Sequence, residues 1–360
     1  MKSFVEFLSR IGCILVIIED VQEVRLLEVD EETISIEFQN MESEVIYTMK
    51  MLLPGNFTIS DRNVSFKSIE QNVFQLRLKA KCNDIVPSSG FDNEIQEKWC
   101  KRGLSQLGHF TFNCINCNNR IISMENFTRL NDMPSEHWEE LMDYWHCHKP
   151  SINDANELGT SLYSRKFKHT LRPIKTELLF GGSNILCLPE SLELETTIND
   201  KEICCKGCGN ELGERTKDNL FKIYKWNLKL YKNNEEYETF DPIDDILMSL
   251  LNFAKEQSGR YISISYKETR LLLWLFNTGL HITTSESHTL KDANKILYTT
   301  DNELINATIQ NHNIEEITVQ SSPFQGCISE LRQSNEALPI SLQKFGKWSV
   351  GYLELYNHSN

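Results

Sequence analysis

Two Cys-x-x-Cys pairs constrain the fold of this chain more than any other feature of its sequence. Cys114 and Cys117 form the first pair, and Cys205 and Cys208 form the second. Four thiolates in two close pairs are typical of a tetrahedral structural zinc site, which leaves no open coordination position for chemistry. A zinc ion held in this way contributes on the order of 10 kcal/mol to folding. The sequence therefore predicts a zinc knuckle at each pair.

The spacing of the pairs leaves open which residues share an ion. The 87 residues between them permit one shared four-cysteine site, which we favour. Each pair could instead complete a site of its own with His146, Cys147 or His148. A plainer alternative is that the pairs are reduced cysteines of an apolar core. A redox motif is a weaker one, because neither pair opens a helix after a strand. Cys204 lacks the two-residue spacing, so we expect it to be a bystander.

Charge and hydropathy exclude two classes of partner. The formal net charge is −14 and no Lys/Arg-rich block interrupts it, so we expect no direct binding of nucleic acid. The apolar run at residues 11–18 is too short to span a bilayer, and it predicts a buried β-strand and no membrane association. We see no secretory signal, so the eleven cysteines indicate a reducing compartment.

Three consecutive regions are expected along the chain, and the fold class is α+β. Residues 1–100 carry short β-branched runs broken by turns, which predict a β-rich domain. Residues 101–218 hold the cysteine pairs among irregular segments, which predicts a zinc-knuckle region held together by metal as much as by apolar burial. Residues 219–360 show both strand and helix patterns, which predict an α+β C-terminal domain.

The C-terminal region carries the clearest local patterns. Residues 221–231 alternate apolar and polar side chains apart from a slip near Tyr224, which predicts one half-buried strand with a bulge. Asp241 and Pro242 then fit the N-cap and first position of a helix with one apolar stripe. Residues 261–266 and 271–277 predict two more strands, the second buried on both faces.

A Trp-x-Cys-His sequence lies between the two cysteine pairs and ends at His148. Apolar periodicity over residues 133–148 predicts a helix with a core-facing stripe, and it places Cys147 on the side away from that stripe. An outward thiol beside an imidazole is poorly explained by packing. Cys147 and His148, together with Trp145, are therefore candidate partner-binding residues.

Taken together, these motifs resemble a family of HECT-like ubiquitin ligases that bind ubiquitin-conjugating enzymes. Fungal members of that family are described as factors of mRNA cleavage and polyadenylation. The resemblance continues weakly through residues 271–277 and 338–342, so it spans most of the chain. The residues that carry it are Cys114, Cys117, Pro134, Ser135, Glu136, Trp138, Trp145, Cys147, His148, Cys205, Cys208, Leu212, Gly213 and Glu214.

The resemblance implies a ubiquitin-conjugating enzyme as a partner. Family members are described as binding it through the C-terminal domain, which here points to Ile246, Leu250 and Phe253 on the predicted helix. The alternative is an ordinary core helix with a polar outer face. A HECT-type ligase also passes ubiquitin through its own thiolate, and Cys327, 33 residues from the end, is the candidate nucleophile. Since no histidine adjoins Cys327, the alternative is a small apolar packing residue.

The fungal branch implies a second partner, the pre-mRNA endonuclease of metallo-β-lactamase fold with two zinc ions in its active site. We expect Cys147, as thiolate, to ligate one of those ions while His148 orients or assists it. Such a ligand could displace the water that the nuclease needs as its nucleophile. The alternative is that Cys147 or His148 completes a second structural zinc within this chain.

The resulting prediction is a zinc protein of the nucleus and cytoplasm that acts chiefly by binding. Its role would be that of an assembly or stability factor for the mRNA 3′-end endonuclease. The alternative is a ubiquitin-protein ligase that acts with a conjugating enzyme, with Cys327 as its candidate thioester cysteine. The sequence leaves open whether the chain is an enzyme; if it is one, we expect a ubiquitin-protein transferase.

Overall fold

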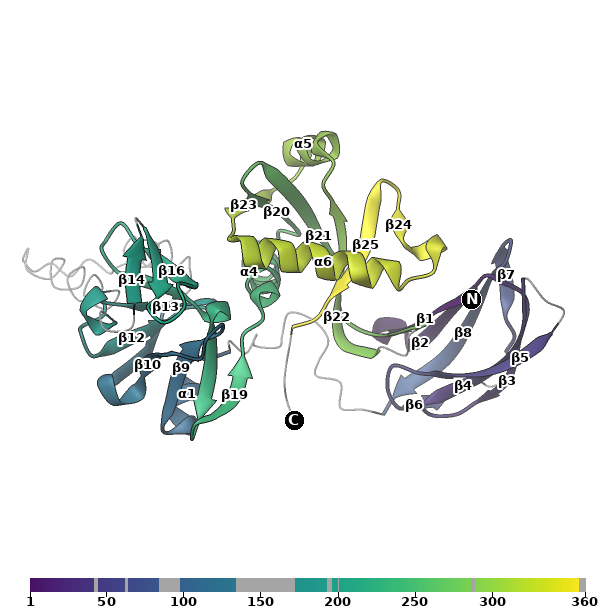
Figure 1. The fold of residues 1–360 in the computed structure, drawn as a ribbon. Coiled ribbons are helices and arrows are strands. Elements are labelled where there is room, and N and C mark those ends of the chain that lie inside the picture. The colour runs from purple at the N-terminus through teal and green to yellow at the C-terminus, as the bar shows by residue number, and fades with distance from the viewer. Residues whose placement is uncertain are drawn as a thin grey trace, which may run out of the picture. The chain divides into compact units, whose positions relative to one another are not determined.

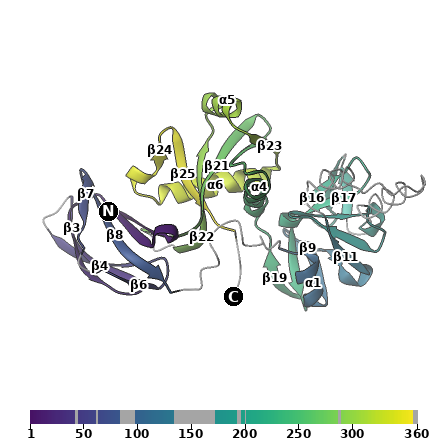
Figure 2. The same cartoon turned by 180° about the vertical axis from the view of Figure 1, so that it is seen from behind.

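The computed structural model divides the chain into two compact units. Unit 1 combines Met1–Ile95 with Ile243–Asn360, and unit 2 is Gln96–Pro242. Figures 1 and 2 show the ribbon from opposite sides. This division differs from the three consecutive regions 1–100, 101–218 and 219–360 that the sequence led us to expect. The residues that the structure describes are 1–41, 45–61, 64–83, 98–133, 172–192, 196–199, 201–285 and 289–355.

Unit 1 is built on an eleven-stranded sheet. Its strands are β1 (Lys2–Leu8), β2 (Cys13–Glu19), β6 (Phe57–Ile59), β7 (Lys67–Glu70), β8 (Val73–Cys82), β20 (Tyr261–Tyr266), β21 (Thr269–Thr284), β22 (Thr289–Thr299), β23 (Ile314–Thr318), β24 (Lys344–Phe345) and β25 (Trp348–Leu353). The path runs β24-β25-β22-β21-β1-β2-β8-β6, with β20 beside β21, β23 beside β20 and β7 beside β8.

Pairing between the two ends of the chain explains why unit 1 is discontinuous in sequence. The first strand, β1, pairs antiparallel with β2 and also with β21, where Phe4 lies opposite Thr284. The N-terminal strands therefore extend a sheet whose other half comes from residues beyond 260. Strand β2 covers most of residues 11–18 and is largely buried, so the predicted buried strand is confirmed.

A second, three-stranded sheet completes the N-terminal part of unit 1. It has the order β3 (Val21–Val29), β4 (Thr33–Asn40) and β5 (Ile46–Leu52), and all its pairings are antiparallel. Its inner residues, such as Ile34 and Ile36, join Ile14, Val16 and Leu78 of the large sheet in one apolar core. Strands thus predominate in the N-terminal segment, in agreement with the β-rich character expected there.

Two helices cover one face of the C-terminal strands in unit 1. Buried side chains of α4 (Pro242–Gln257) and α6 (Ser321–Glu336) share a core with β20, β21 and β22. Helix α6 lies in front of these strands in Figure 1 and behind them in Figure 2. The first helix begins at Pro242, as predicted, and β20 coincides with the predicted strand at residues 261–266. A third helix, α5 (Asn302–Asn311), is capped by the Asp301 carboxylate.

The long strand β21 contains the predicted strand at residues 271–277, but only one of its faces is fully buried there. Leu271, Leu273 and Leu275 face the helices and are buried. On the opposite face Trp274 is half-buried and Phe276 is 37% exposed. The expectation of burial on both faces therefore holds only in part: on the second face Leu272 is fully buried, whereas Trp274 and Phe276 are not.

Unit 2 contains two sheets packed around one apolar core. The four-stranded sheet has the order β10 (Arg120–Ser123), β9 (Phe110–Cys114), β18 (Leu228–Lys232) and β19 (Glu235–Thr239). The seven-stranded sheet has the order β11 (Arg129–Asp132), β12 (Glu177–Phe180), β13 (Asn184–Cys187), β17 (Phe221–Tyr224), β16 (Glu211–Arg215), β15 (Glu202–Cys205) and β14 (Thr196–Asn199). A short helix, α1 (Lys101–Leu107), precedes β9. The described residues of the middle region are thus largely in strands rather than irregular.

The predicted single strand at residues 221–231 is wrong. Strand β17 ends at Tyr224, a 3-10 turn covers Lys225–Asn227, and β18 then continues in the other sheet. The turn is fixed by Lys225, which is fully buried and donates from Nζ to the carbonyl oxygens of Lys98 (2.7 Å) and Gly182 (2.9 Å). The apparent slip in the alternation near Tyr224 is therefore a change of sheet and not a bulge.

None of the helices in the described part of the chain combines the length and the apolar character needed to cross a membrane.

Candidate metal centre

Each Cys-x-x-Cys pair lies at the end of a β-hairpin in unit 2. Cys114 is the last residue of β9, and Cys117 lies in the turn that leads to β10. Cys205 is the last residue of β15, and Cys208 lies in the turn that leads to β16. The first cysteine of each pair is buried and the second is exposed. The strands therefore fix one ligand of each pair within the core, and the turns bring the other over it.

The two turns close with the same backbone hydrogen bonds. In the first turn the Cys114 N–H donates to the Asn119 carbonyl (2.8 Å), and the Asn118 N–H donates to the Cys114 carbonyl (2.9 Å). The second turn repeats both bonds at 2.8 Å, with Gly209 and Asn210 at the equivalent positions. Two segments that are far apart in the sequence thus form the same knuckle.

Backbone geometry explains the residues that follow each pair. Asn118 has φ +60° and Gly209 has φ +72°, a left-handed conformation that asparagine and glycine adopt most readily. At Gly207 a Cβ would lie 3.4 Å from both the Cys117 sulfur and the Asn119 Cβ, so the two knuckles are in close contact there. The shared C-x-x-C-x-Asn pattern is a sequence signal for this pairing that cysteine spacing alone does not contain.

The four sulfurs form one cluster. Cys114 Sγ lies 3.7 Å from Cys208 Sγ, Cys117 Sγ lies 3.6 Å from Cys205 Sγ, and all four atoms lie within 4.8 Å of one another. Four sulfurs around one tetrahedral ion, each bonded at about 2.3 Å, are separated by about 3.8 Å. The cluster could therefore hold a single metal ion, which is the shared arrangement that the spacing allowed.

The electrostatics of the cluster favour a bound cation. Desolvation raises the pKa of the Cys114 thiol to about 12, so its thiolate needs a compensating positive charge. At the exposed Cys208, the backbone N–H of Asn210 donates to sulfur and lowers the pKa to about 7. Metal binding requires deprotonated sulfur, and a cation in the cluster would stabilise all four thiolates together.

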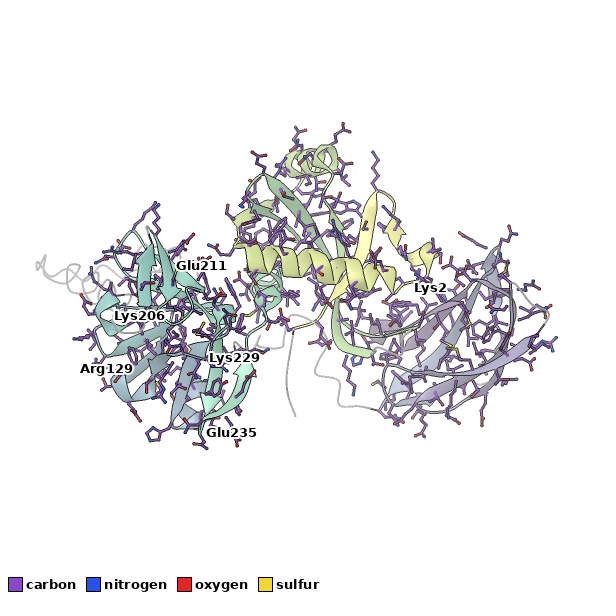
Figure 3. All side chains as sticks on the ribbon, in the orientation of Figure 1. Lys2, Arg129, Lys206, Glu211, Lys229 and Glu235 are labelled. Atoms are coloured by element: carbon purple, nitrogen blue, oxygen red, sulfur yellow. The ribbon has the colours of Figure 1, made fainter. Side chains whose placement is uncertain are left out.

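Three carboxylates lie on the hairpin of the second knuckle. Glu202 pairs with Glu214 across β15 and β16, and Glu211 begins β16. Partial burial, followed by the neighbouring charges of Glu202 and Glu214, raises the pKa of Glu211. Glu211 and Lys206 are labelled in Figure 3 on this hairpin. The hairpin of the second knuckle carries charges of both signs, because Lys206 lies between its two cysteines and Lys222 pairs with Glu214 at 3.7 Å.

The connectivity shows what a metal in this cluster can do. Cys114 and Cys117 belong to the hairpin of the four-stranded sheet, whereas Cys205 and Cys208 belong to the seven-stranded sheet. An ion bound to all four would link the two sheets of unit 2. Because four protein ligands fill a tetrahedral ion, no position remains for a substrate or for water. A metal ion held by all four sulfurs would therefore have a structural role.

The other candidate residues differ in how far the structure places them. Trp145, Cys147 and His148 lie outside the described residues, as does the whole predicted helix except Met133. Their expected contact with a partner's zinc ion, and the alternative of a second structural zinc, therefore stay predictions. Cys204 lies next to the cluster on β15 but does not belong to it, as expected for a bystander.

Cys327 lies in the interior of unit 1. Its side chain is fully buried in α6, in the core that also contains Phe324, Leu331 and Leu250. Burial, followed by the nearby charge of Glu330, raises the pKa of the Cys327 thiol to about 12. A thiol in this environment is protonated near neutral pH and cannot be reached by a ubiquitin thioester. The arrangement favours the packing role over the nucleophilic role that the resemblance suggested.

The helix residues proposed for contact with a conjugating enzyme are also interior. Ile246 and Leu250 are fully buried, and Phe253 is buried to 4% exposure, all in the core beneath α4. None of the three can contact a partner unless α4 leaves the sheet. This burial favours the core-helix alternative, because the apolar stripe of α4 packs within unit 1, and contact of these residues with a conjugating enzyme stays a prediction.

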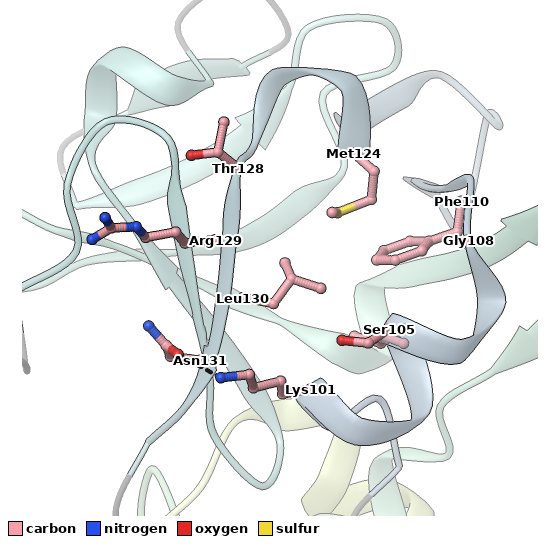
Figure 4. Close-up of a pocket in the computed structure, with 10 residues that line it drawn as sticks. Lys101, Ser105, Gly108, Phe110, Met124, Thr128, Arg129, Leu130 and Asn131 are labelled. Atoms are coloured by element: carbon pink, nitrogen blue, oxygen red, sulfur yellow. Dashed lines mark hydrogen bonds between the residues drawn. The ribbon is translucent and has the colours of Figure 1, made fainter.

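A shallow cavity of about 460 Å³ opens between α1 and β11 in unit 2 (Figure 4). Leu104, Phe110, Met124 and Leu130 supply its apolar lining, and Lys101 and Arg129 lie among its polar residues. Lys101 Nζ donates to Asn131 Oδ1 at 2.9 Å, and the Asn131 amide donates to Glu177 Oε1 at 2.6 Å. These polar side chains connect α1 to β11 and β12, so they serve the packing of unit 2.

Comparison with known proteins identifies relatives along almost the whole chain. The model of the family described as HECT-like ubiquitin-conjugating enzyme (E2)-binding matches residues 6–350. The Saccharomyces cerevisiae protein YJR141W is 34% identical over 358 residues, which cover 99% of each chain. A human protein named as an E3 ubiquitin-protein ligase is 22% identical over 362 residues, 84% of this chain and 92% of the human one. Its mouse counterpart is 23% identical over 313 residues, 78% of each chain. No solved structure matches the chain.

Proposed function

Because the chain belongs to the family of HECT-like ubiquitin-conjugating enzyme (E2)-binding proteins, we propose that it binds an E2 and acts as an E3 ubiquitin-protein ligase. The observation that carries this proposal is the extent of the family match, which spans residues 6–350 and so includes segments of both units. The human and mouse proteins named as E3 ligases also align over most of their own length. A match confined to the cysteine pairs would have supported only a shared metal knuckle.

The proposed transfer does not pass through Cys327. Among the described cysteines only Cys117 and Cys208 are exposed, and both belong to the cluster. In this proposal the ligase holds the charged E2 and a substrate together, and the E2 thioester carries out the transfer. A substrate lysine attacks the carbonyl carbon of the thioester, the bond to the E2 sulfur breaks, and the amine loses its proton as the amide forms.

We also propose that the metal of the four-cysteine cluster is zinc. Four thiolates in tetrahedral reach of one another are the ligand set that structural zinc prefers. Zinc would supply no reaction step here and would hold the hairpins of the two sheets in register. In this proposal Cys114 and Cys205 anchor the ion from the core, and Cys117 and Cys208 close over it from the exposed turns.

The partnership with a metallo-β-lactamase-fold endonuclease depends on Cys147 and His148. Because both residues lie outside the described part of the chain, that partnership stays a prediction, as do the role in mRNA 3′-end processing and the location in nucleus and cytoplasm. Its test is a pull-down of the endonuclease with Cys147→Ala, read beside the zinc content of the variant.

The proposed function is tested with the full-length protein and a panel of purified E2 enzymes. Binding is measured by biolayer interferometry, and each charged E2 is then followed for loss of its thioester to free lysine, with and without the chain. We expect at least one E2 to bind and to lose its ubiquitin faster in the presence of the chain. A panel drawn from all E2 classes in which none binds would contradict the proposal.

A further inference from the structure

Five aromatic side chains cluster on the face of the large sheet that α4 and α6 leave uncovered. They are Tyr261 of β20, Trp274 and Phe276 of β21, Phe345 of β24 and Trp348 of β25, and they are called the aromatic face below. Strand register brings them together, because Tyr261 lies directly opposite Trp274 and Phe345 lies directly opposite Trp348. All five belong to unit 1.

The rings of the aromatic face form one continuous contact network. Ring centroids are 5.2 Å apart for Tyr261 and Trp274, and 5.6 Å apart for Trp274 and Trp348. Trp274 also meets Phe276 at 5.6 Å, and Phe276 meets Phe345 at 5.5 Å. Most of these pairs are tilted or edge-on, an arrangement that rigidifies the rings against one another. The network is therefore a preformed surface and not a set of independent side chains.

The core accounts for only part of this surface: Trp274 and Trp348 border a buried cluster that contains Leu297 and Val350, whereas Phe276 and Phe345 belong to no core cluster. Leu271, Leu273 and Leu275, which alternate with its β21 members, already fill the core on the helix side. Phe345 remains 52% exposed and Phe276 37% exposed, while Tyr261, Trp274 and Trp348 are half-buried. Single exposed apolar residues are ordinary, but two exposed phenylalanines in contact with partly exposed tryptophans form a contiguous apolar patch, which is typical of an interaction surface.

The charges around the aromatic face are opposite to the charge of the chain. Lys295 places its ammonium 5.6 Å from the centre of the Phe276 ring, and Lys344 and Lys347 flank Phe345 in the sequence. The segments 272–279 and 344–353, which supply four of the five rings, contain no Asp or Glu, although the net charge of the whole chain is −14. This local cationic rim fits a partner that offers apolar side chains next to carboxylates.

We propose that the aromatic face is the docking surface for the E2, which seats an apolar segment flanked by acidic side chains on it. This inference rests on the proposed function and names the surface that carries it out. A protein partner fits better than a single-stranded nucleic acid, because base stacking needs free ring faces and these rings are packed against one another. Buried aromatic anchors inside a charged rim are the usual anatomy of a protein-binding centre.

The test compares E2 affinity for the full-length wild type and for Phe345→Ala, Phe276→Ala and the double charge reversal Lys344→Glu with Lys347→Glu. We expect each aromatic variant to raise Kd at least about tenfold, because central aromatic anchors dominate interface energetics. The charge reversal should slow association, and its effect should shrink at high salt. Tyr237→Ala is the matched control, since Tyr237 is 55% exposed on β19 of unit 2 and should leave Kd unchanged.

Each other outcome has a defined meaning. If an E2 binds the wild type and the three variants equally well, the docking surface is wrong while the proposed function stands. If no E2 binds the wild type, both the proposed function and this inference are wrong. Two further results would overturn the E2 as occupant. One is a dimer, seen by sedimentation, that the variants dissociate without a change in E2 affinity. The other is binding of a labelled single-stranded RNA that the variants abolish without a change in E2 affinity.

Retained folding is checked with the thermal midpoint and the metal content of every variant. Phe345 and Phe276 are partly exposed, so truncation should lower the midpoint only slightly. A variant that loses E2 binding but keeps the wild-type midpoint then supports the surface. If Phe345→Ala should unfold, the charge reversal on the exposed hairpin provides the decisive comparison, because it removes no packing side chain.

Discussion

The cysteine cluster of unit 2 and the single Cys327 of unit 1 differ in their surroundings. The four sulfurs of the cluster lie at hairpin ends, two of them exposed; a backbone N–H lowers the pKa of Cys208 to about 7, while burial raises that of Cys114 to about 12. In unit 1 Cys327 lies among leucine, isoleucine and phenylalanine side chains, and burial raises the pKa of its thiol to about 12. Four sulfurs gathered within 4.8 Å can share a metal cation that compensates their thiolate charges, whereas the single thiol of Cys327 behaves as a small apolar group. The difference predicts that unit 2 depends on its metal and that unit 1 depends on its apolar core.

The largest effect is expected when a cluster ligand is removed. Cys205→Ser should reduce the metal content from one ion per chain to near zero and unfold unit 2, with a loss on the order of 10 kcal/mol. Mass spectrometry of the metal, combined with calorimetry of the two units, measures both. Cys204→Ala, one residue away on the same strand, should keep the metal. A full metal content in Cys205→Ser would show that the four-cysteine cluster is not the metal site.

A truncation in the core of α4 is expected to affect unit 1 instead. Leu250→Ala should cost about 2–5 kcal/mol because it leaves a cavity at a fully buried position. The metal content should not change, since the cluster belongs to unit 2. E2 affinity, corrected for the folded fraction from urea unfolding, should also match the wild type. A specific loss of E2 binding in folded Leu250→Ala would restore this helix as the partner site.

A smaller effect is expected where β16 approaches β17. A Cβ at Gly213 would collide with the Lys222 carbonyl and the Ile223 backbone, so Gly213→Ala should cost about 1–3 kcal/mol and lower the midpoint of unit 2. Gly103→Ala is the control, because a Cβ there meets nothing closer than the Cys100 sulfur at 3.9 Å. That control, in helix α1, should be neutral or stabilising by about 0.5–1 kcal/mol. Equal midpoints for Gly213→Ala and Gly103→Ala would show that β16 and β17 accommodate the added methyl group without a loss of stability.

The smallest effect concerns a buried carboxyl in unit 1. Burial raises the pKa of Glu6 above its ordinary 4.5, so its ionised form disfavours the folded state at neutral pH. This penalty disappears as the pH falls through the raised folded pKa. Glu6→Gln should therefore raise the midpoint of unit 1 at pH 7, and the difference from wild type should narrow on acidification. Glu70→Gln, at an exposed position on β7, should show no such trend. If the difference in midpoint between Glu6→Gln and the wild type widens on acidification, the ionised form of Glu6 does not destabilise the fold.

The local patterns of the sequence were sufficient for the knuckles and for several elements. Cysteine spacing indicated one shared cluster, the capping residues Asp241 and Pro242 marked the start of α4, and the apolar run at residues 11–18 gave β2. Each of these three features depends on residues that are close together in the sequence. The pairing of β1 with β21 depends on residues far apart, and no local pattern indicates which distant strand completes a sheet.

The failures of sequence reasoning have the same physical origin. An amphipathic stripe such as Ile246, Leu250 and Phe253 looks the same whether it packs on a sheet or on a partner, and only the sheet beneath α4 decides. Lys225 ends β17 by finding two carbonyl acceptors from distant segments. Trp274 and Phe276 of the aromatic face lie within an apolar run whose alternation does not tell which face of the strand the helices cover.

The most direct test of the account is the single-turnover loss of ubiquitin from a charged E2 to lysine, measured with the wild-type chain and with Cys327→Ala. We expect both proteins to accelerate the loss to the same extent, and no thioester of ubiquitin to form on either, because Cys327 is interior and protonated. A ubiquitin thioester on the wild type that Cys327→Ala abolishes, with the midpoint of unit 1 unchanged, would contradict the account.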